Sequence, residues 1–384
     1  MADRQKVFDA DTHFQPAAES IVQFLDKAMV ARLPDLEEFK TPVTTGRAGQ
    51  AIEPPYRHWY RFARGGGWGA GKPRHLGEAG PRESEERHFQ TFMGERYPTL
   101  GVEDHLIDIR VAEMDEEGVD AQILVPSAFT GHTDPTVDVA FIQALNRFLD
   151  HSCGQHPDRL YSMIFTTARD IPASVAEVKA WGNKKWAKGI YLDLPLDYPI
   201  DHPDLHPLWA AVDDAGLTMC HHSFATGYPG YRDLWENPFI GRTAGHPWGA
   251  MRSVAAFFGS GLFDKYPNMK YAVMESGFGW LPFWAKRMED QVVYMGYVAE
   301  NLQRSMTEYM TDGRFFCSIV LHEGPEMVRM VSEILGDHIL MFGSDYPHAE
   351  SRFPISVKTI DDWPLTDEVR RKIMWDNAAR CFDL

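Results

Sequence analysis

Acidic and imidazole side chains end several short apolar segments of this 384-residue chain, at positions far apart in the sequence. They are Asp11, His13, His221, His222, Glu275 and Asp345. Carboxylates and imidazoles bind divalent ions, and an ion with an open coordination position can polarise a substrate or activate a water molecule. The residues therefore indicate a hydrolytic or Lewis-acid centre, provided that the fold brings the segments together.

The two ends of the chain carry the clearest signals. Near the C-terminus, an apolar run delivers Asp345 at its tip, and near the N-terminus Asp11 and His13 stand two residues apart. Residues i and i+2 of a strand point to the same face, so Asp11 and His13 can converge on one ion. A lone buried histidine is usually structural, but several unpaired charges at different strand tips are costly unless they share a ligand.

The elements that must position these residues follow a regular alternation of strand and helix. Eight short apolar segments are expected to be strands: Val7–Asp11, Ala121–Val125, Leu160–Phe165, Gly189–Leu194, Leu217–His222, Met269–Glu275, Arg314–Ile319 and Ile339–Ser344. Helical spacing fills stretches between them, namely Val137–Gly154, Ile171–Lys185, His206–Ala215 and Glu326–Leu335. This pattern predicts an α/β fold, a (β/α)8 TIM-like barrel forming a single domain over residues 1–384. An open doubly wound sheet is the alternative, but the glycine-rich dinucleotide turn after the first strand is missing.

A long insertion interrupts the alternation after the first strand. Residues 12–120 separate the first two expected strands, whereas a βα unit usually needs about 30 to 40 residues. Within this stretch, residues 37–98 are rich in Gly, Pro, Arg and aromatic residues. Because the insertion leaves from the catalytic end of the first strand, we expect a lid or dimerisation arm; a passive insertion is the alternative. Its Trp59 and Arg61, together with Arg252, could grip an aromatic ring or a carboxylate.

Composition narrows the class of protein. The formal net charge of −17 argues against nucleic-acid binding but leaves an acidic or aromatic small-molecule substrate open. The four scattered cysteines predict buried free thiols of a reducing compartment. No signal peptide or membrane-spanning segment is recognisable, so the expected location is the cytoplasm.

Several motifs resemble the amidohydrolase superfamily, in the branch typified by aminocarboxymuconate-semialdehyde decarboxylase and γ-resorcylate decarboxylase. They are Asp9-Ala10-Asp11-Thr12-His13, Gly245-His246-Pro247, the run from Gly261 through Lys270 into Glu275-Ser276-Gly277-Phe278-Gly279-Trp280-Leu281-Pro282, and Gly343-Ser344-Asp345-Tyr346-Pro347-His348. Asp376-Asn377-Ala378-Ala379-Arg380 is also similar to the closing helix of the family. The resemblance covers most of residues 1–30 and 101–384 and specifies no substrate.

The resemblance implies a role for each matching residue. One divalent metal, zinc in first place and manganese in second, would bind Asp11, His13, His222 and Asp345. Asp11 departs from the family pattern of His-x-His or Glu-x-His, and of the fifth-strand pair His222 fits the register better than His221. Asp345 and His246 would handle protons. Apart from the resemblance, Glu275, Arg252, Trp59 and Arg61 are the expected substrate-binding residues. Members of the family associate as dimers or higher oligomers, so the resemblance also implies a homodimer or higher homo-oligomer.

These inferences favour a decarboxylase of a small aromatic or unsaturated carboxylic acid, in which Asp345 or His246 delivers a proton to carbon. The first alternative is a metal-dependent hydrolase of a C–C, ester or amide bond that uses an activated water molecule. The second is a metal-binding barrel without activity. An intact set of ligands argues against the second alternative, and measurement of bound metal would test it.

Overall fold

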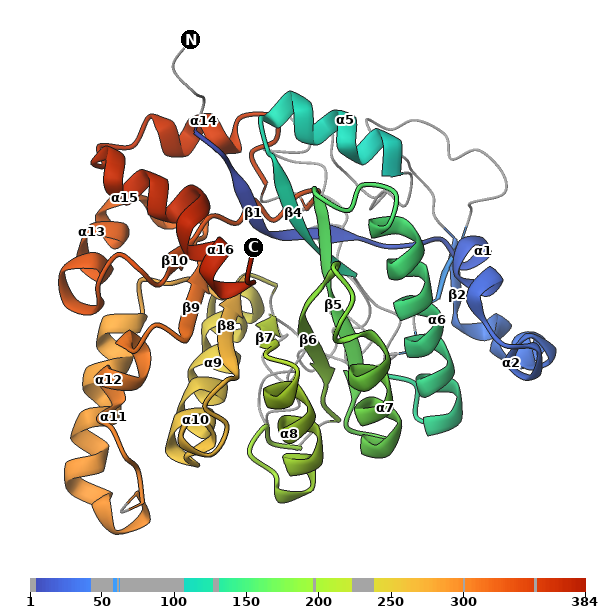
Figure 1. Cartoon of the computed structure of the whole chain (residues 1–384), viewed down its shortest axis with the longest axis horizontal. Helices are drawn as coiled ribbons and strands as arrows, with labels where there is room; N and C mark the ends of the chain where they lie inside the picture. The colour runs from blue at the N-terminus through green and yellow to red at the C-terminus, as the bar shows by residue number, and fades with distance from the viewer. Residues whose placement is uncertain are drawn as a thin grey trace, which may run out of the picture.

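A computed structural model of the chain describes residues 5–42, 58–60, 62, 107–126, 131–195, 198–222, 238–299, 301–348 and 351–384. Eight strands form one parallel sheet in the order β1-β4-β5-β6-β7-β8-β9-β10, with helices outside it (Figure 1). The strands are β1 Phe8–Phe14, β4 Ala121–Pro126, β5 Leu160–Thr167, β6 Ala187–Asp193, β7 Thr218–His222, β8 Lys270–Met274, β9 Phe315–Ser318 and β10 Leu340–Met341. All eight expected strands are present, and the predicted TIM-like barrel is confirmed.

The first and last strands close the barrel. The amide of Ala10 donates to the carbonyl oxygen of Phe342 at 2.9 Å, and the amide of Asp345 donates to that of Asp11 at 3.0 Å. An isolated parallel bridge joins Thr12 to Tyr346 beyond the short strand β10. Residues from opposite ends of the sequence therefore meet at the C-terminal end of the strands, as the motifs predict.

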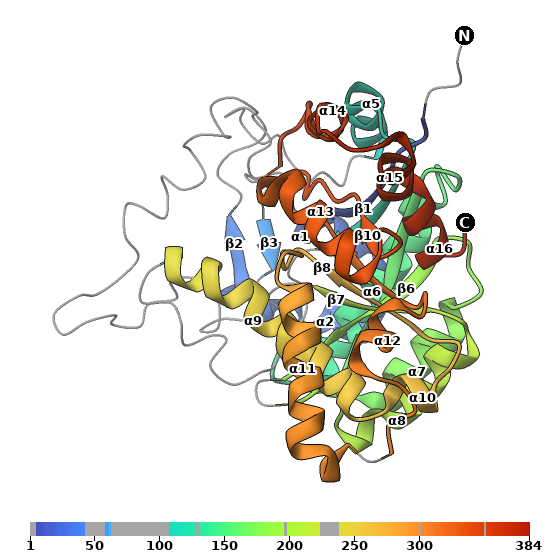
Figure 2. The same ribbon diagram turned by 90° about the vertical axis from the view of Figure 1, so that its left-hand side faces the viewer.

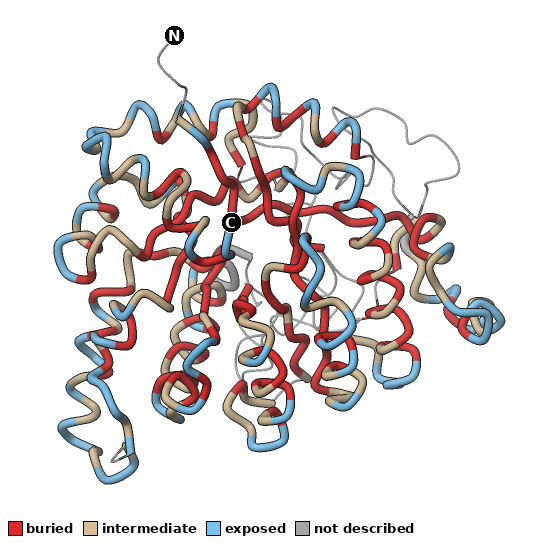
Figure 3. The backbone as a smooth tube through the Cα atoms, in the orientation of Figure 1, coloured by how far each residue is buried: buried red, intermediate tan, exposed pale blue. Residues whose placement is uncertain are grey.

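Helices surround the strands. They are α1 Ala18–Ile21, α2 Lys27–Arg32, α5 Ile107–Glu117, α6 Pro135–Cys153, α7 Ile171–Trp181, α8 His206–Asp214, α9 Pro238–Gly259, α10 Leu262–Lys265, α11 Leu281–Met295, α12 Met306–Thr311, α13 Gly324–Leu335, α14 Ser356–Asp361, α15 Asp367–Arg371 and α16 Asn377–Cys381. Shorter turns are η1 Val22–Phe24, η2 Leu33–Phe39, η4 Pro203–Leu205, η5 Gly296–Val298, η6 Leu321–Glu323 and the π-helical η7 Lys372–Asp376. Figure 3 shows buried strands inside and helices whose outer faces are exposed.

Local sequence explains where the long helices begin. The carboxylate of Asp134 accepts a hydrogen bond from the amide of Thr136 at the start of α6, and Asp170 accepts one from Ala173 at the start of α7. Both helices also carry proline in their first turn, where no amide donor is needed. The four helical stretches expected from the sequence are present as α6, α7, α8 and α13.

Apolar side chains fill the barrel interior below the site. Phe8, Ile123 and Met163 lie in one buried cluster with Phe316 and Met341. Ala378, Cys381 and Phe382 belong to the same cluster, so α16 and the residue after it cover the end opposite the site. A second cluster fills the space between strands and helices. The barrel is thus a packed core that leaves chemistry to its C-terminal rim.

The described part of the insertion packs against the barrel. Strand β2 (Lys40–Pro42) pairs antiparallel with β3 (His58–Tyr60). Tyr60 and Phe62 are buried, with ring centroids 5.0 and 4.7 Å from that of Phe141 on α6. The rest of the predicted segment 37–98 after Pro42 lies outside the described residues, so the lid or dimerisation arm stays a prediction.

Two simpler expectations concern cysteines and membranes. All four cysteines are free and buried, as predicted. Among the helices within the described ranges, none combines the length and apolar character needed to cross a bilayer.

Candidate metal centre

A bulge in β1 turns the first two candidate ligands toward the barrel interior. Phe8 and Ala10 point inward, because both belong to the interior cluster. The register with β4 then shifts between Asp9 and Thr12. One extra residue reverses which side chains face inward, so Asp11 and His13 take over the interior side near the rim.

Imidazole and carboxylate atoms from opposite sides of the barrel meet at this rim. The Nε2 atoms of His13 and His222 lie 3.2 Å apart. Asp11 Oδ1 lies 3.6 Å from the first and 3.4 Å from the second. Glu275 Oε2 lies 3.2 Å from His222 Nε2 and 3.7 Å from His13 Nε2. Four side chains from β1, β7 and the end of β8 thus direct nitrogen and oxygen atoms at one another.

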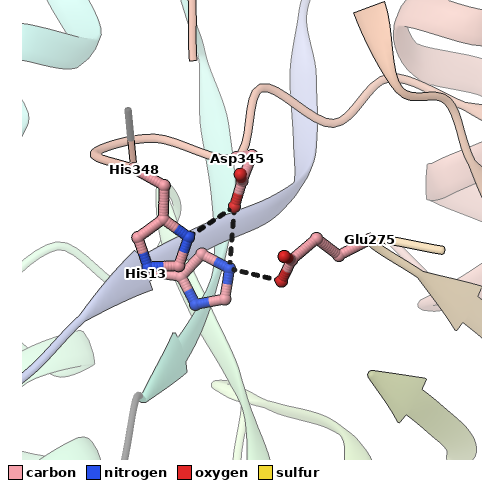
Figure 4. A group of neighbouring side chains, drawn as sticks. All are labelled: His13, Glu275, Asp345 and His348. Carbon is pink, nitrogen blue, oxygen red and sulfur yellow. Dashed lines mark hydrogen bonds and ion pairs between the residues drawn. The ribbon is translucent and has the colours of Figure 1, made fainter. Parts of the chain in front are cut away.

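Asp345 joins the group from the end of β10, and His348 comes with it (Figure 4). Asp345 Oδ1 lies 3.1 Å from His13 Nε2 and 2.8 Å from His348 Nδ1. The rings of His13 and His348 stack with centroids 4.0 Å apart. Two sets of ligand atoms, each within 4.8 Å of one another, can hold a metal ion: His13, Glu275, Asp345 and His348, and Asp11, His13 and His222.

Hydrogen bonding sets the tautomer of His13. Its Nδ1 atom lies 3.2 Å from the carbonyl oxygen of Val125, which can only accept. Nδ1 therefore carries the proton, and the lone pair of Nε2 is directed toward the other candidate ligands, which are called the ligand cluster from here on. Burial, followed by the charge of His348, lowers the pKa of His13 and favours its neutral form. A neutral imidazole oriented through its other nitrogen is the usual state of a metal ligand.

The two carboxyl groups at the ends of β8 and β10 differ in protonation. Burial, followed by the nearby Asp345 carboxylate, raises the pKa of Glu275 to about 8. Burial also raises the pKa of Asp345, but His348 and His13 together outweigh it and hold that pKa below its usual range. The cluster thus contains an ionised Asp345 beside a carboxyl group that retains its proton at neutral pH.

Backbone conformation at the strand ends is unusual in the same two residues. Glu275 has φ of 49° and Asp345 has φ of 59°, both in the left-handed region that non-glycine residues rarely occupy. Such residues cost roughly 1–3 kcal/mol each and cluster at functional sites. The turns that aim these carboxylates inward are therefore maintained at the expense of local stability.

Buried polar groups next to the cluster fix its backbone. Asp9 Oδ1 accepts hydrogen bonds from the amides of Ser344 at 2.9 Å and Asp11 at 3.3 Å. Burial raises the pKa of Asp9 to about 8. The hydroxyl of Ser318, at the end of β9, lies 3.5 Å from Asp11 Oδ2 and accepts from the amide of Glu275 at 3.2 Å. Ser318 thus links the residues from β1 and β8.

His246 lies on α9, next to the end of β8. Its Nδ1 atom is 3.0 Å from the carbonyl oxygen of Glu275 and 3.8 Å from the Oε1 atom of the same residue. Because the carbonyl can only accept, Nδ1 carries the proton and Nε2 has the lone pair. The structure therefore places His246 beside the cluster, in contact with one of its carboxyl residues.

Of four further residues singled out from the sequence, none is among the grouped candidate ligands, and one lies outside the described chain. His221 is buried on β7, where strand alternation points it away from His222, and burial lowers its pKa to about 3. Arg252 lies on α9, its guanidinium carbon 5.9 Å from the ring centroid of Trp248. Trp59 is half-buried on β3. Arg61 lies outside the described residues.

Sequence reasoning missed one contributor, His348, which was visible only as part of a motif; the local signal was its position three residues after Asp345. Glu275 was recognised among the strand-tip residues but assigned to substrate, and in the structure its carboxyl group also lies among the candidate ligand atoms. Ordinary strand periodicity cannot predict either position, since both depend on turns with positive φ.

The donors fit a divalent cation. Asp11 Oδ1 and Asp345 Oδ2 are buried and accept no hydrogen bond from the described part of the chain. Unsatisfied buried carboxylate oxygens are costly. A cation bound beside them would remove this penalty. Mixed carboxylate and imidazole donors suit Mn²⁺ and Zn²⁺ alike.

Comparisons with known proteins match the chain to one enzyme family and to decarboxylases. The sequence profile of the family described as "Amidohydrolase" matches residues 9–384. A γ-resorcylate decarboxylase from Polaromonas sp. (strain JS666 / ATCC BAA-500) is 25% identical over 309 residues, which cover 72% of this chain and 87% of the relative.

Solved structures of two decarboxylases share the fold. That of 5-carboxyvanillate decarboxylase from Sphingomonas paucimobilis has a TM-score of 0.67 at 17% identity and covers 99% of both chains. A 5-carboxyvanillate decarboxylase from Novosphingobium aromaticivorans, complexed with manganese and 4-hydroxy-3-methoxy-5-nitrobenzoic acid, has a TM-score of 0.65 at 17% identity. It covers 100% of this chain and 97% of its own.

Proposed function

Because the chain belongs to the amidohydrolase family, we propose that it is a metal-dependent decarboxylase of a small aromatic carboxylic acid. Two overlapping groups of candidate ligands at the barrel rim support this proposal: Asp11, His13 and His222 form one, and His13, Glu275, Asp345 and His348 form the other, so that His13 is common to both. The relatives add to it, because the matched γ-resorcylate decarboxylase and the 5-carboxyvanillate decarboxylases act on aromatic acids according to their names. They favour a carboxy-lyase over a hydrolase.

Manganese is the proposed metal, held by Asp11, His13, His222 and Asp345. Zinc, which the sequence placed first, has no support from these comparisons, whereas a neighbouring decarboxylase structure contains manganese. When bound, such an ion supplies Lewis-acid polarisation of substrate oxygens. Glu275 and His348 complete the surroundings, since Glu275 lies 3.2 Å from His222 and His348 lies 2.8 Å from Asp345.

Decarboxylation of an aromatic acid requires a proton at the ring carbon from which carbon dioxide leaves. The C–C bond to the carboxylate breaks, a C–H bond forms at the same carbon, and the bonding electrons remain on the ring until the proton arrives. Asp345 and His246 are the proposed proton carriers. Asp345 is ionised at neutral pH, so it must first take a proton, for example from a substrate hydroxyl group, before it can donate one.

The proposed activity is tested by measuring carbon dioxide released from candidate substrates. We would strip the purified protein of metal, restore it with Mn²⁺ or Zn²⁺, and incubate it with a panel of hydroxylated and methoxylated benzoates. Carbon dioxide and the matching decarboxylated arene should form only with restored metal. Hydrolysis of esters or ring-cleavage products without carbon dioxide release would refute the proposal in favour of a hydrolase.

Elemental analysis tests the ligands separately. The double variant His13→Ala, His222→Ala should fold, by circular dichroism, yet contain no metal. His221→Ala is the matched control, because it removes a neighbouring buried imidazole from the other side of the same strand, and it should keep its metal. Full metal occupancy in the double variant, or loss of metal in the control alone, would overturn the assignment.

The insertion over residues 37–98 is proposed to cover the barrel mouth. Its described residues support this, because the amide and ring nitrogen of His58 contact Glu19 on α1, and α1 follows the catalytic end of β1. Excluding water would let protonation of carbon compete with side reactions. Trp59, Arg61 and Arg252 stay proposed substrate contacts.

A further inference from the structure

Helix α11 and the following turn η5 expose an unusual amount of apolar surface. The exposed fractions are 61% for Phe283, 81% for Tyr294 and 73% for Tyr297, and Val293 and Val298 reach 87% and 65%. Aromatic side chains bury about 150–250 Å² each when covered, so the three rings alone represent on the order of 500 Å². Four of these five residues, Val293, Tyr294, Tyr297 and Val298, gather at the C-terminal end of α11 and in η5, and an exposed apolar patch of this kind usually marks an interaction site.

The exposed residues of α11 follow a regular seam. Leu281, Ala285 and Met288 are buried against the barrel, at intervals of four and three residues. On the outer side, Phe283, Arg287, Asp290 and Tyr294 repeat at intervals of four, three and four, and all four are exposed. Intervals of three and four residues are those of a helix that packs along a second helix. The helix therefore has one seam for its own core and another that faces solvent.

The position of α11 makes this outer seam accessible. The helix lies at the outer edge of the molecule in Figure 1 and runs along the side turned toward the viewer in Figure 2. Its C-terminal end and η5 extend beyond the neighbouring helices in both views. A flat partner surface or another helix can therefore approach it.

We propose that a second copy of this chain covers the seam, with the two α11 helices antiparallel about a twofold axis between residues 288 and 289. In this register Phe283 of each copy packs on Tyr294 of the other, and Arg287 of each copy faces Asp290 of the other. Both pairs occur twice because a twofold contact is self-complementary. Tyr297, Val293 and Val298 extend the apolar contact at each end.

The charges of Arg287 and Asp290 favour a second copy of this chain over a different partner at the seam. Within one chain, Arg287 Nη1 and Asp290 Oδ2 are 3.7 Å apart, and their side chains are 51% and 70% exposed. In the antiparallel register each charge gains an opposite charge, whereas a parallel pair would set like charges together. The net charge of −17 opposes non-specific self-association, so the local complementarity selects this arrangement. The three aromatic rings, on the order of 500 Å², would supply the larger part of the roughly 800 Å² per partner that a standard interface buries.

Charge exchange tests the register. Wild-type protein at micromolar concentration should sediment as a dimer or as a larger assembly built from such dimers. Asp290→Arg should weaken this association at least tenfold, because it sets Arg287 against a second arginine. The double variant Arg287→Glu, Asp290→Arg restores opposite charges across the axis and should recover the association. Failure of the double variant to recover, when the single variant dissociates, would overturn the register.

An apolar variant tests the surface itself. Tyr294→Asp should dissociate the pair, while Ile109→Asp on α5, which alters another exposed apolar residue, should not. Circular dichroism and metal content establish that each variant is folded. A monomeric wild type, or an unchanged assembly in Tyr294→Asp, would overturn the proposal. The measurement is independent of the proposed activity, since it reads only the mass of the particle.

Discussion

A single methyl group at residue 343 is expected to disturb the metal centre without unfolding the barrel. A Cβ atom added to Gly343 would lie 2.9 Å from the Cβ of Asp11 and 3.2 Å from the Cβ of Ser318. The backbone fixes both atoms, so neither can rotate away. Ordinary contact begins at 3.4 Å, so the end of β10 and Asp11 must separate by about 0.5 Å (3.4 − 2.9).

The expected losses of stability and of metal affinity follow from this displacement. Forcing extra volume into a packed region costs about 1–3 kcal/mol of unfolding free energy, which a barrel of this size can tolerate. The displaced residue is a candidate ligand, and disturbing the support of a metal ligand costs about 10- to 100-fold in metal affinity or activity. Gly343→Ala should therefore fold, with Mn²⁺ affinity, measured by calorimetric titration of the stripped protein, reduced by about that factor.

Gly259→Ala is the matched control. It makes the same substitution at the end of α9, where an added Cβ meets nothing within 4 Å. Its metal affinity should equal that of the wild type. Equal affinities in Gly343→Ala and Gly259→Ala would refute the reasoning that the close approach of β10 positions Asp11.

Two further predictions concern proton transfer and pH. His246→Ala should keep its metal but lose about 10²- to 10⁴-fold in turnover, the scale of a general acid–base group; loss of the metal would make it a ligand, and unchanged turnover would make it structural. Burial raises the pKa of Glu117 from 4.5 to about 7. The folded state binds this proton more tightly than the unfolded state, so stability is fully present below pH 4.5 and falls as pH rises through about 7. The total loss is about 3 kcal/mol. Glu117→Gln, which can still accept from the amide of Val357, should remove this dependence in urea unfolding between pH 4.5 and 8; parallel curves for both proteins would contradict it.

The eight strands could be predicted because parallel barrel strands are buried on both faces. They therefore appear in the sequence as short continuous apolar runs, and several of those in this chain are followed by polar residues at the rim. β10 was overestimated, since it spans only Leu340–Met341 where Ile339–Ser344 was expected. Gly343 and Ser344 leave the regular ladder because Ser344 hydrogen-bonds the side chain of Asp9 instead. Here tertiary contacts override the local pattern.

The spacing of Asp11 and His13 predicts correctly that their side chains lie together, but not that they face the barrel interior. The i, i+2 spacing of Asp11 and His13 places them on one side of the strand, but it cannot say which side. Phe8 and Ala10 already face inward, so a strand without irregularity would have turned Asp11 and His13 toward the helices. The bulge between Asp9 and Thr12 turns Asp11 and His13 toward the barrel interior, and no residue type in this segment predicts the bulge.

The left-handed backbone at Glu275 and Asp345 explains why the remaining site geometry could not be read from periodicity. Strand alternation predicts side-chain direction only while φ stays in the extended region, and both residues leave it. At Asp345 the turn also returns His348 onto the ring of His13, 4.0 Å away, where it holds the pKa of Asp345 down. The left-handed conformation at Asp345 thus directs its carboxylate inward and brings His348 beside it. Without such a partner this backbone conformation is unfavourable. Such strain persists where the surroundings and the ligand stabilise it, and this makes the two strand ends the most specific structural sign of function in the chain.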